Sequence, residues 1–183
     1  IFVNPTQFND PKDLEKYPRP IEQDIALLQT ANCDILFLPT VEEMYPPNEE
    51  KWLIDLGRLD QIWEGEKRPG HFQGVTQIVY KLFQLVEPHI ACFGQKDFQQ
   101  VMVIQKMIEI KELAVQLIIC PIIRDDNGLA LSSRNVRLSA NGKQKALVLS
   151  KSLNYVREQF NFQSLPVLKA NALQIIAQEG DVD

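Results

Sequence analysis

Short apolar runs that are rich in β-branched residues recur along the chain up to Pro121. They cover residues 1–3, 34–38, 90–93 and 115–120. Strands of a parallel sheet that is covered on both faces have this texture, because neither face selects polar residues at alternate positions. The runs therefore predict buried parallel strands.

Helical patterns separate these runs. Pro20 can occupy a first helical turn, Pro88 closes a second pattern, and a third pattern begins at Phe98. The apolar stripes comprise Ile21, Ile25 and Leu28; Phe72, Val75, Val79, Leu82 and Val86; and Phe98, Val101, Ile104 and Ile108. Strands that alternate with helices favour right-handed βαβ crossovers. We therefore predict an α/β fold with a Rossmann-like, doubly wound parallel sheet.

The texture changes after Pro121. Asn127 and Gly128 lie between two apolar pieces, which is a hairpin signal because both residues tolerate positive φ. We place a domain boundary here, which gives domains 1–122 and 123–183. The second is expected to be part of a smaller α+β domain.

Two helices are expected at the end of the chain. Ser139 can cap the first, and Ser164 can cap the second, which reaches Ala177. The apolar stripe expected on the first comprises Ala146, Leu149, Leu153, Val156 and Phe160.

Composition limits the function classes. The 183 residues are 45% hydrophobic and 23% charged, a balance typical of a soluble globular protein of one or two small domains. The net charge of -5 argues against capture of a nucleic-acid backbone, which needs clustered Lys and Arg. No apolar run approaches the ~20 residues that span a bilayer. We expect a cytoplasmic protein without nucleic-acid or membrane partners, in which any phosphate chemistry is local.

Cysteine and histidine usage gives no metal site. Cys33, Cys92 and Cys120 lie in or beside apolar runs and form no C-x-x-C pair. They are expected to be reduced core residues rather than disulfide partners or metal ligands. His71 and His89 are too few for a His-rich site.

The stretch GQKDFQQ joins an apolar run to a helical pattern at Gly94. Asp97 can cap the helix, and Gln100 can bond back to it in a capping box. This does not explain Lys96, because a helix N-terminus favours negative charge. A glycine and a lysine between a parallel strand and a helix are typical of a phosphate site. From this segment alone, a structural cap and a phosphate site are both open.

The segment LSSRN, residues 131–135, combines two hydroxyls with a guanidinium after the predicted hairpin. One interpretation is a solvated loop with a helix cap. The other is an anion clamp, in which Arg134 holds phosphate oxygens in a fork and Ser132 and Ser133 add hydrogen bonds. A nucleophilic serine is not expected, because no G-x-S-x-G elbow surrounds these residues.

Two further segments carry polar residues beside predicted elements. NPTQF, residues 4–8, is either an ordinary turn or places Gln7 in the crevice outside the sheet, where a neutral amide both donates and accepts hydrogen bonds. In EGEKRPGHFQGV, we expect Gly70 and Gly74 to serve the turn and helix packing. We expect His71 to be a structural or lid residue rather than a base.

Taken in order, these segments resemble the pantoate beta-alanine ligases, which are the pantothenate synthetase family of the nucleotidyltransferase superfamily. The matching motifs are IFVNPTQF, DLEKYPR, DIALL, PTVEEMYP, EG...RPGHFQGV, KLF, FGQKDFQQ and GLALSSRN. They span residues 1–139, and the helical tail is similar to the start of the family's second domain.

The resemblance implies an ATP- and Mg²⁺-dependent ligase. Such enzymes adenylate the carboxylate of pantoate and release pyrophosphate. The amine of beta-alanine then attacks the pantoyl adenylate to give pantothenate and AMP. The resemblance also implies a homodimer whose small-molecule partners are pantoate and beta-alanine.

The family pattern implies roles for particular residues. Lys96 and Arg134 would be catalytic, with Lys96 offsetting charge as the α-phosphate is attacked. The residues implied for ATP are Gly94, Gln95, Lys96, Asp97, Ile123, Leu131, Ser132, Ser133 and Arg134. Those implied for pantoate and beta-alanine are Asn4, Gln7 and Gln100. No residue is implied as a metal ligand.

The chain also departs from the family. Gln95 stands where the family has Glu. The family's P-T-M-G turn and H-x-G-H segment, which contact ATP, do not precede Ile1, and neither His71 nor His89 has the context to replace them. The family's second domain continues beyond Asp183. We therefore expect the chain alone to be inactive, and the alternative to a ligase is a non-catalytic binding or dimerisation module.

Overall fold

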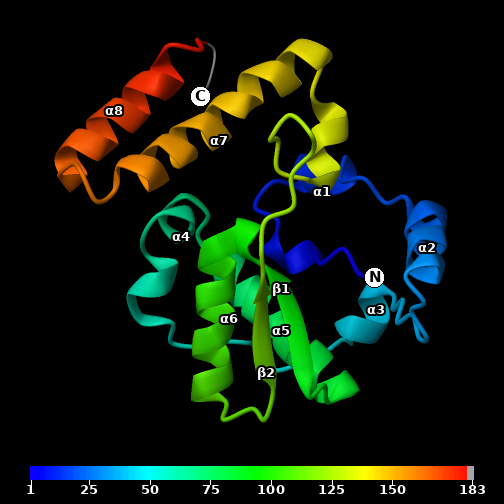
Figure 1. The fold of residues 1–183 in the computed structure, drawn as a ribbon. Helices are drawn as coiled ribbons and strands as arrows, with labels where there is room; N and C mark the ends of the chain where they lie inside the picture. Colours follow the sequence, from blue (N-terminus) through cyan, green and yellow to red (C-terminus); the bar gives the residue numbers. More distant parts are fainter. Residues whose placement is uncertain (181–183) are drawn as a thin grey trace. The chain divides into compact units, whose positions relative to one another are not determined.

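The computed structural model describes residues 1–180 and divides the chain into two compact units, Ile1–Pro121 and Ile122–Asp183 (Figure 1). The first holds a parallel sheet, and the second is helical apart from one hairpin. The separate binding roles expected for residues 1–122 and 123–183 stay predictions.

The sheet of the first unit consists of two parallel strands, β1 (Ile90–Gly94) and β2 (Gln116–Cys120). They pair over their full length, so both end at the same edge. The connection runs through a short 3₁₀ turn, η3 (Gln95–Asp97), and the helix α6 (Phe98–Ile110). This is the βαβ unit that the alternating pattern predicts, and the α/β class is confirmed.

The core of the first unit lies against α5 (His71–Val86) and α6, which pack on each other (Figure 1). Each helix has apolar residues at helical spacing and presents them to one side. The buried apolar cluster comprises Met44, Ile54, Leu56, Phe72, Val75, Ile78, Val79, Phe83, Ala91, Val103, Ile104, Met107 and Ile108. Burial of one large side chain contributes about 1.5–3 kcal/mol, so α5 and α6 form the frame of this unit.

Short elements surround the frame. They are η1 (Pro5–Gln7), α1 (Pro11–Glu15), α2 (Ile21–Thr30), α3 (Val41–Met44), η2 (Gly57–Asp60) and α4 (Glu64–Lys67). Side-chain caps fix where several begin. Asp10 accepts a hydrogen bond from the Lys12 N–H, and Thr40 and Glu43 form a capping box.

The second unit packs α7 (Ala140–Gln159) against α8 (Leu165–Ala177), after the 3₁₀ segment η4 (Ser133–Arg137). The two helices lie where the sequence predicts them. Within residues 1–180, no helix has both the length and the apolar character that a membrane span requires.

The caps of these two helices differ. The Ser139 hydroxyl accepts a hydrogen bond from the Gly142 N–H at 3.0 Å, as predicted. Ser164 stands at the N-cap of α8, but its side chain makes no capping hydrogen bond, so that prediction was wrong. Pro166 at the second helical position of α8 lacks an N–H, which removes one of the two donors that a cap can bind.

A single antiparallel bridge, between Arg124 and Ala130, closes the predicted hairpin. Gly128 has a φ of 97°, the left-handed geometry that glycine adopts without strain. The carboxylate of Asp125 accepts hydrogen bonds from the N–H of Asn127 and from the N–H of the residue after Gly128. The turn therefore rests on Asp125 as well as on the Asn-Gly pair.

Two predicted strands, residues 1–3 and 34–38, are not part of a sheet. The Ile1 amino group donates to the Phe37 carbonyl oxygen, but a strand needs a ladder of backbone pairs along its length. Ile35 is 84% exposed, so this segment lacks the burial that its composition predicts. An apolar run becomes a buried strand only where a neighbour supplies hydrogen-bond partners and a covered face.

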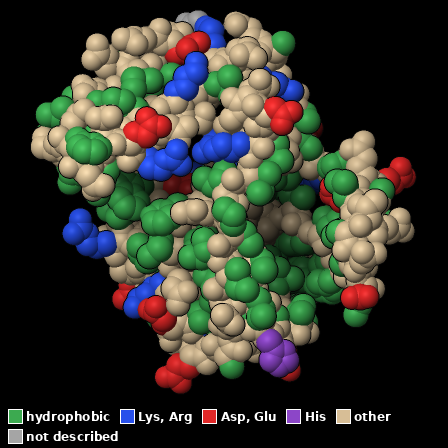
Figure 2. Space-filling model, viewed as in Figure 1, with side chains coloured by type: hydrophobic (Ala, Val, Ile, Leu, Met, Phe, Trp, Pro, Cys, Tyr) green, Lys and Arg blue, Asp and Glu red, His purple; other side chains and the backbone are tan. Residues whose placement is uncertain are grey.

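The prediction of core cysteines was wrong. Cys33 and Cys92 are exposed and Cys120 is half-buried, although all three are free thiols, as expected. Residues of β1 alternate between two faces, and the buried cluster includes Ala91 but not its neighbour Cys92. Figure 2 shows apolar side chains gathered over β1 and β2, where Ile118 is also exposed.

On α7 the predicted apolar stripe is not the buried face. Leu149, Leu153 and Phe160 are exposed. The buried side chains of α7 are Val148, Ser150 and Ser152. The Ser152 hydroxyl donates to the Ala172 carbonyl oxygen of α8 at 3.1 Å, so a serine outside the predicted stripe contacts α8.

Candidate functional site

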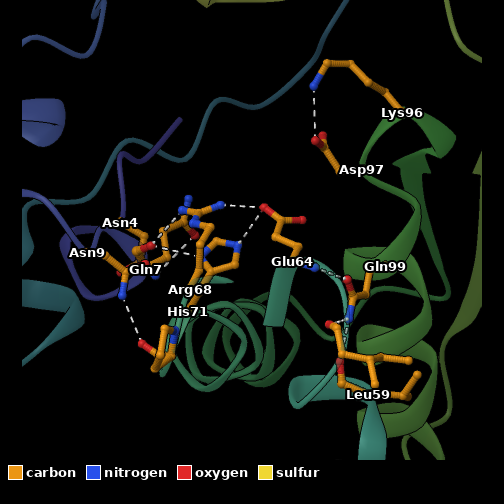
Figure 3. A network of polar contacts seen from close by, with 12 residues as sticks. Asn4, Gln7, Asn9, Leu59, Glu64, Arg68, His71, Lys96, Asp97 and Gln99 are labelled. Carbon is orange, nitrogen blue, oxygen red and sulfur yellow. Dashed lines mark hydrogen bonds and ion pairs between the residues drawn. The ribbon is translucent and has the colours of Figure 1, made fainter. Parts of the chain in front are cut away.

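The candidate site begins where β1 ends. Gly94 is the last residue of the strand, and a Cβ there would meet no atom within 4 Å, so the backbone is open on this side. Lys96 follows in η3, and its Nζ donates to a carboxylate oxygen of Asp97 at 3.0 Å (Figure 3). Both side chains are exposed. A cation is therefore presented to solvent at the carboxyl edge of the sheet and the start of α6.

The expected capping box at this junction was wrong. Asp97 occupies the N-cap position of α6, but its side chain makes no capping hydrogen bond. The chain enters α6 through the 3₁₀ turn η3, and the Asp97 carboxylate pairs with Lys96 instead. The first N–H groups of α6 therefore donate no hydrogen bond to the Asp97 carboxylate. Gln95 is exposed and Gln100 is half-buried in the first turns of this segment.

Asn4 anchors the start of η1. It is 3% exposed, and its Nδ2 donates to the Gly74 carbonyl oxygen of α5 at 3.0 Å. Its Oδ1 accepts hydrogen bonds from the Tyr45 hydroxyl at 2.6 Å and the Thr6 hydroxyl at 3.1 Å. Asn4 is thus engaged with protein groups on both sides of its amide. Burial and the Glu49 charge raise the pKa of Tyr45, partly offset by the bonds to Thr6 and Asn4.

Gln7 ends η1, and its backbone carbonyl oxygen accepts two hydrogen bonds (Figure 3). Arg68 Nη2 donates at 3.1 Å, and His71 Nδ1 donates at 2.8 Å. The side-chain Oε1 of Gln7 lies 3.5 Å from Asn4 Nδ2. The backbone of Gln7 is therefore fixed by two side chains that come from the α4–α5 segment.

Glu64 connects these two donors. Its Oε1 accepts a hydrogen bond from Arg68 Nη1 and lies 3.7 Å from His71 Nε2. Burial is the largest cause that lowers the pKa of His71, and the Arg68 charge lowers it further, against the Gln7 carbonyl, Glu64 and Asp97. His71 is therefore neutral near pH 7. Its proton is on Nδ1, because a carbonyl oxygen can only accept.

Gln99 is a buried polar residue that the sequence interpretation missed. It is 6% exposed, and its Nε2 donates to the carbonyl oxygens of Leu59 and Ile62 at 2.6 and 2.8 Å. Its Oε1 accepts from the Glu64 N–H at 3.0 Å. Gln99 thus ties the first turn of α6 to the segment that carries Glu64 (Figure 3).

Glu64 and Arg68 were also missed. Their four-residue spacing is the signal that was available, because residues at i and i+4 face each other on a helix. His71 was expected to be a structural or lid residue rather than a base, and its burial and its bond to Gln7 agree with the structural alternative. Gly70 serves the turn with a φ of 80°, as expected.

The second unit holds the remaining predicted residues in one loop. Ser132 is the N-cap of η4, and its hydroxyl accepts from the Arg134 N–H at 3.3 Å. The Leu131 N–H donates to the Ile123 carbonyl oxygen at 2.9 Å, so these two exposed residues lie across the hairpin from each other. Ser133 follows Ser132 at the start of η4. A common nucleotide site that includes residues of both units stays a prediction.

Metal ligands are not clustered in the described residues. Within residues 1–180, no group of three or more His, Cys, Asp or Glu side chains is placed to hold an ion.

Residues 1–182 match the family model for pantoate-beta-alanine ligase. The chain is 51% identical over 172 residues to the pantothenate synthetase of Cytophaga hutchinsonii, which covers 93% of this chain and 60% of the relative. It is 51% identical over 157 residues to that of Porphyromonas gingivalis, which covers 86% of this chain and 56% of the relative. The chain thus spans 56–60% of the length of these relatives.

Solved structures give the same picture. The match to the pantothenate synthetase of Thermus thermophilus has a TM-score of 0.89 at 44% identity. It covers 98% of this chain and 64% of the Thermus thermophilus chain. The pantoate-beta-alanine ligase of Francisella tularensis, complexed with beta-gamma ATP and beta-alanine, has a TM-score of 0.78 at 36% identity. That match covers 96% of this chain and 66% of the other.

Proposed function

Because the chain belongs to the pantoate-beta-alanine ligase family, we propose that it binds ATP and pantoate and acts as part of an ATP-dependent ligase that makes pantothenate. The observation that carries the proposal is Lys96, an exposed cation between the end of β1 and the start of α6. Phosphate sites of open α/β sheets lie at this edge.

The reaction has two steps. A carboxylate oxygen of pantoate forms a bond to the α-phosphorus of ATP, and the bond from that phosphorus to pyrophosphate breaks. The amine of beta-alanine then adds to the acyl carbon, loses a proton to solvent and displaces AMP. A carboxylate resists amines until its oxygen becomes part of a good leaving group, so ATP is consumed to make the pantoyl adenylate, a mixed anhydride from which AMP departs.

Lys96 supports the first step in this proposal. Negative charge builds on the phosphate oxygens as the carboxylate attacks, and a cation already in position stabilises it without reorganisation. Gly94, Gln95 and Asp97 would line the same ATP site. The open backbone at Gly94 supports close approach of the phosphates.

Gln7 and Gln100 would hold pantoate, and Gln7 would later hold the carboxylate of beta-alanine. A neutral amide suits both tasks, because it donates to a carboxylate and accepts from a hydroxyl without ionising. Asn4 would lie beside them. Its burial and its bonds to protein groups support a role in holding η1 rather than in direct contact with substrate.

Nucleotide contacts from the loop of the second unit are also part of the proposal. Arg134 would bind phosphate oxygens, with Ser132, Ser133 and the backbone at Ile123 and Leu131 around the nucleotide. The hairpin fixed by Asp125 supports a defined loop shape.

Mg²⁺ would arrive with ATP. The ion binds through phosphate oxygens, waters and one or two carboxylates, which does not require the three-residue cluster that is missing from residues 1–180. Bound there, Mg²⁺ would offset phosphate charge. A homodimer and a cytoplasmic location are further parts of the proposal, and the family resemblance supports the homodimer.

The test uses a chimera in which the chain replaces the aligned part of the Cytophaga hutchinsonii relative, 60% of its length. Pantoate labelled with oxygen-18 in its carboxylate is expected to give labelled AMP, because one carboxylate oxygen stays on phosphorus when the amide forms. Pantothenate formation with unlabelled AMP would contradict the adenylate route. A folded chimera that binds pantoate but makes no product would favour the binding module.

A further inference from the structure

The turn η1 is held at both of its ends by side chains (Figure 3). At its start, Asn4 donates to the Gly74 carbonyl oxygen of α5. At its end, the Gln7 carbonyl oxygen receives Arg68 and His71. No sheet supports this turn, since residues 1–3 before it form no strand.

We propose that Arg68 and His71 are positioning residues for pantoate, which set the direction of the Gln7 side chain by occupying both acceptor positions of the Gln7 carbonyl oxygen. This proposal rests on the proposed function, which assigns Gln7 to pantoate. Glu64 supports the same arrangement. Its carboxylate binds Nη1 of the Arg68 guanidinium, while Nη2 of Arg68 donates to the Gln7 carbonyl oxygen.

A three-residue turn supplies few hydrogen bonds to orient its own last residue. The final carbonyl groups of a helical turn have no partner inside it, and 3₁₀ hydrogen bonds are weaker than those of an α-helix. The Phe8 N–H lies in the same peptide as the Gln7 carbonyl and donates to the Pro5 carbonyl oxygen at 3.2 Å, so one hydrogen bond within η1 holds this peptide on its N–H side. Without Arg68 and His71, only this one weak bond within η1 orients the peptide after Gln7, and a substrate group misplaced by ~1 Å can cost about 10²-fold in rate.

The two donors are themselves held in place. His71 is 5% exposed, and its ring lies 4.9 Å from the ring of Phe72, measured between centroids. Arg68 is held by Glu64, whose own N–H is bound by Gln99. A chain of contacts therefore leads from α6 through Glu64 and Arg68 to the carbonyl of Gln7.

The experiment compares three variants of the 183-residue chain. His71→Leu removes the donor and keeps an apolar side chain of similar size, and His71→Asn returns an N–H near the position of Nδ1. Arg68→Met removes the guanidinium and keeps the stem. His89→Leu is the matched control, because it makes the same change at an exposed histidine.

Two measurements separate positioning from folding and from the proposed function. The Gln7 side-chain amide is followed by ¹⁵N NMR, with its signals assigned by their loss in Gln7→Glu. Pantoate and ATP affinities are measured by calorimetry. We expect His71→Leu and Arg68→Met to shift the Gln7 amide signals and to weaken pantoate binding about tenfold with ATP binding unchanged, and His71→Asn to restore both.

Each outcome bears on one of the two proposals. Unchanged Gln7 signals in His71→Leu and Arg68→Met would overturn the positioning role. Equal losses of pantoate and ATP affinity, with no recovery in His71→Asn, would show a merely structural role and would also overturn it. If Gln7 shifts as expected but the unaltered chain does not bind pantoate, the positioning of Gln7 stands and its assignment to pantoate fails.

Discussion

Lys96 and Asp97 form an exposed ion pair at the start of α6. Exposed pairs of this kind contribute roughly 0–1 kcal/mol to stability. A triphosphate can therefore displace Asp97 from the lysine at small cost. The pair keeps the lysine at the helix N-terminus, where a cation alone opposes the helix dipole.

Replacement of Lys96 tests this role directly. Lys96→Ala in the chimera is expected to slow adenylate formation by about 10²-fold or more, because a preorganised partner of the phosphate charge is lost. The rate is measured as pantoate-dependent release of pyrophosphate. Lys106→Ala is the control, since Lys106 is exposed on α6 and pairs with Glu109. Equal rates in the two variants would remove Lys96 from the mechanism.

Gln7→Ala separates the acid substrates from the nucleotide. We expect the KM for pantoate and for beta-alanine to rise about tenfold while the KM for ATP changes little, because in the proposed site the lost amide would make one or two hydrogen bonds to those ligands. Initial rates of the chimera at varied substrate give the three values. Gln84→Ala, at an exposed position of α5, serves as the control. An effect confined to ATP would contradict the assignment of Gln7.

His71 predicts an acid-sensitive stability. Its native pKa lies below the ordinary value of 6.5, so in the interval between them the unfolded chain binds a proton that the native chain does not. The contribution of neutral His71 to the unfolding free energy is fully present above pH 6.5. It is lost as the pH falls through the lowered native pKa of His71. Urea unfolding between pH 5 and 8 measures this.

The groups that face His71 are Arg68, Glu64 and Asp97. In His71→Asn these charges remain and the titrating ring is gone, so the fall in stability below pH 6.5 is expected to become smaller than in the unaltered chain. The control variant His89→Asn is expected to lose as much stability below pH 6.5 as the unaltered chain does. Parallel curves for the unaltered chain and His71→Asn would show that the ring titrates normally.

At the scale of elements, α5 and η1 meet through Gly74. A Cβ at this position would lie 2.5 Å from the Thr6 carbonyl oxygen and 2.9 Å from the Thr6 hydroxyl. Glycine is required at position 74 because a side chain would collide with Thr6, not because the backbone has a positive φ. This close approach is what brings the Asn4 amide within 3.0 Å of the Gly74 carbonyl oxygen.

Gly74→Ala is expected to destabilise the chain. Alanine gains about 1 kcal/mol of helix propensity, but overpacking costs about 1–3 kcal/mol, and the neighbour here is backbone that cannot move aside. We expect a net loss of about 1–2 kcal/mol in the unfolding free energy, measured in urea. Gly142→Ala in α7 is the control, because its nearest neighbour is the Ser139 side-chain oxygen at 3.3 Å. A stable Gly74→Ala would mean that η1 does not pack as described.

The elements that the sequence predicted well are those made by local pattern. The βαβ unit follows from two apolar runs and the helical stripe between them, and α5 follows from its stripe and from Pro88. Residues 34–38 failed because a strand also needs a neighbour, which composition cannot reveal. On α6 the stripe included Phe98, which is 53% exposed, while Gln99 beside it is buried by the η2–α4 segment.

The candidate site was predictable only in part for the same reason. Lys96 stood out because a cation at a helix start conflicts with a simple cap. Arg68 did not, because its bond to Gln7 joins residues 61 positions apart in the sequence. Such long-range contacts depend on how the loops are folded over α5. The four-residue spacing of Glu64 and Arg68 predicts an ion pair but not its target.

At the scale of the whole molecule, two units carry the residues that the proposed ligase needs. The first holds Gln7 and Lys96, and the second holds Arg134. Apolar side chains are exposed on the sheet and on α7, as at Ile119 and Leu153. The curated relatives are longer than the chain, which spans 60% of the Cytophaga hutchinsonii protein.

Exchange of labelled pyrophosphate into ATP, catalysed by the chimera with that relative, tests the central claim most directly. The proposed adenylate step predicts exchange that requires pantoate and proceeds without beta-alanine, because only the first step is reversed. A folded chimera that shows no exchange, while the parent relative exchanges in the same assay, would contradict the account. Exchange that does not depend on pantoate would contradict it as well.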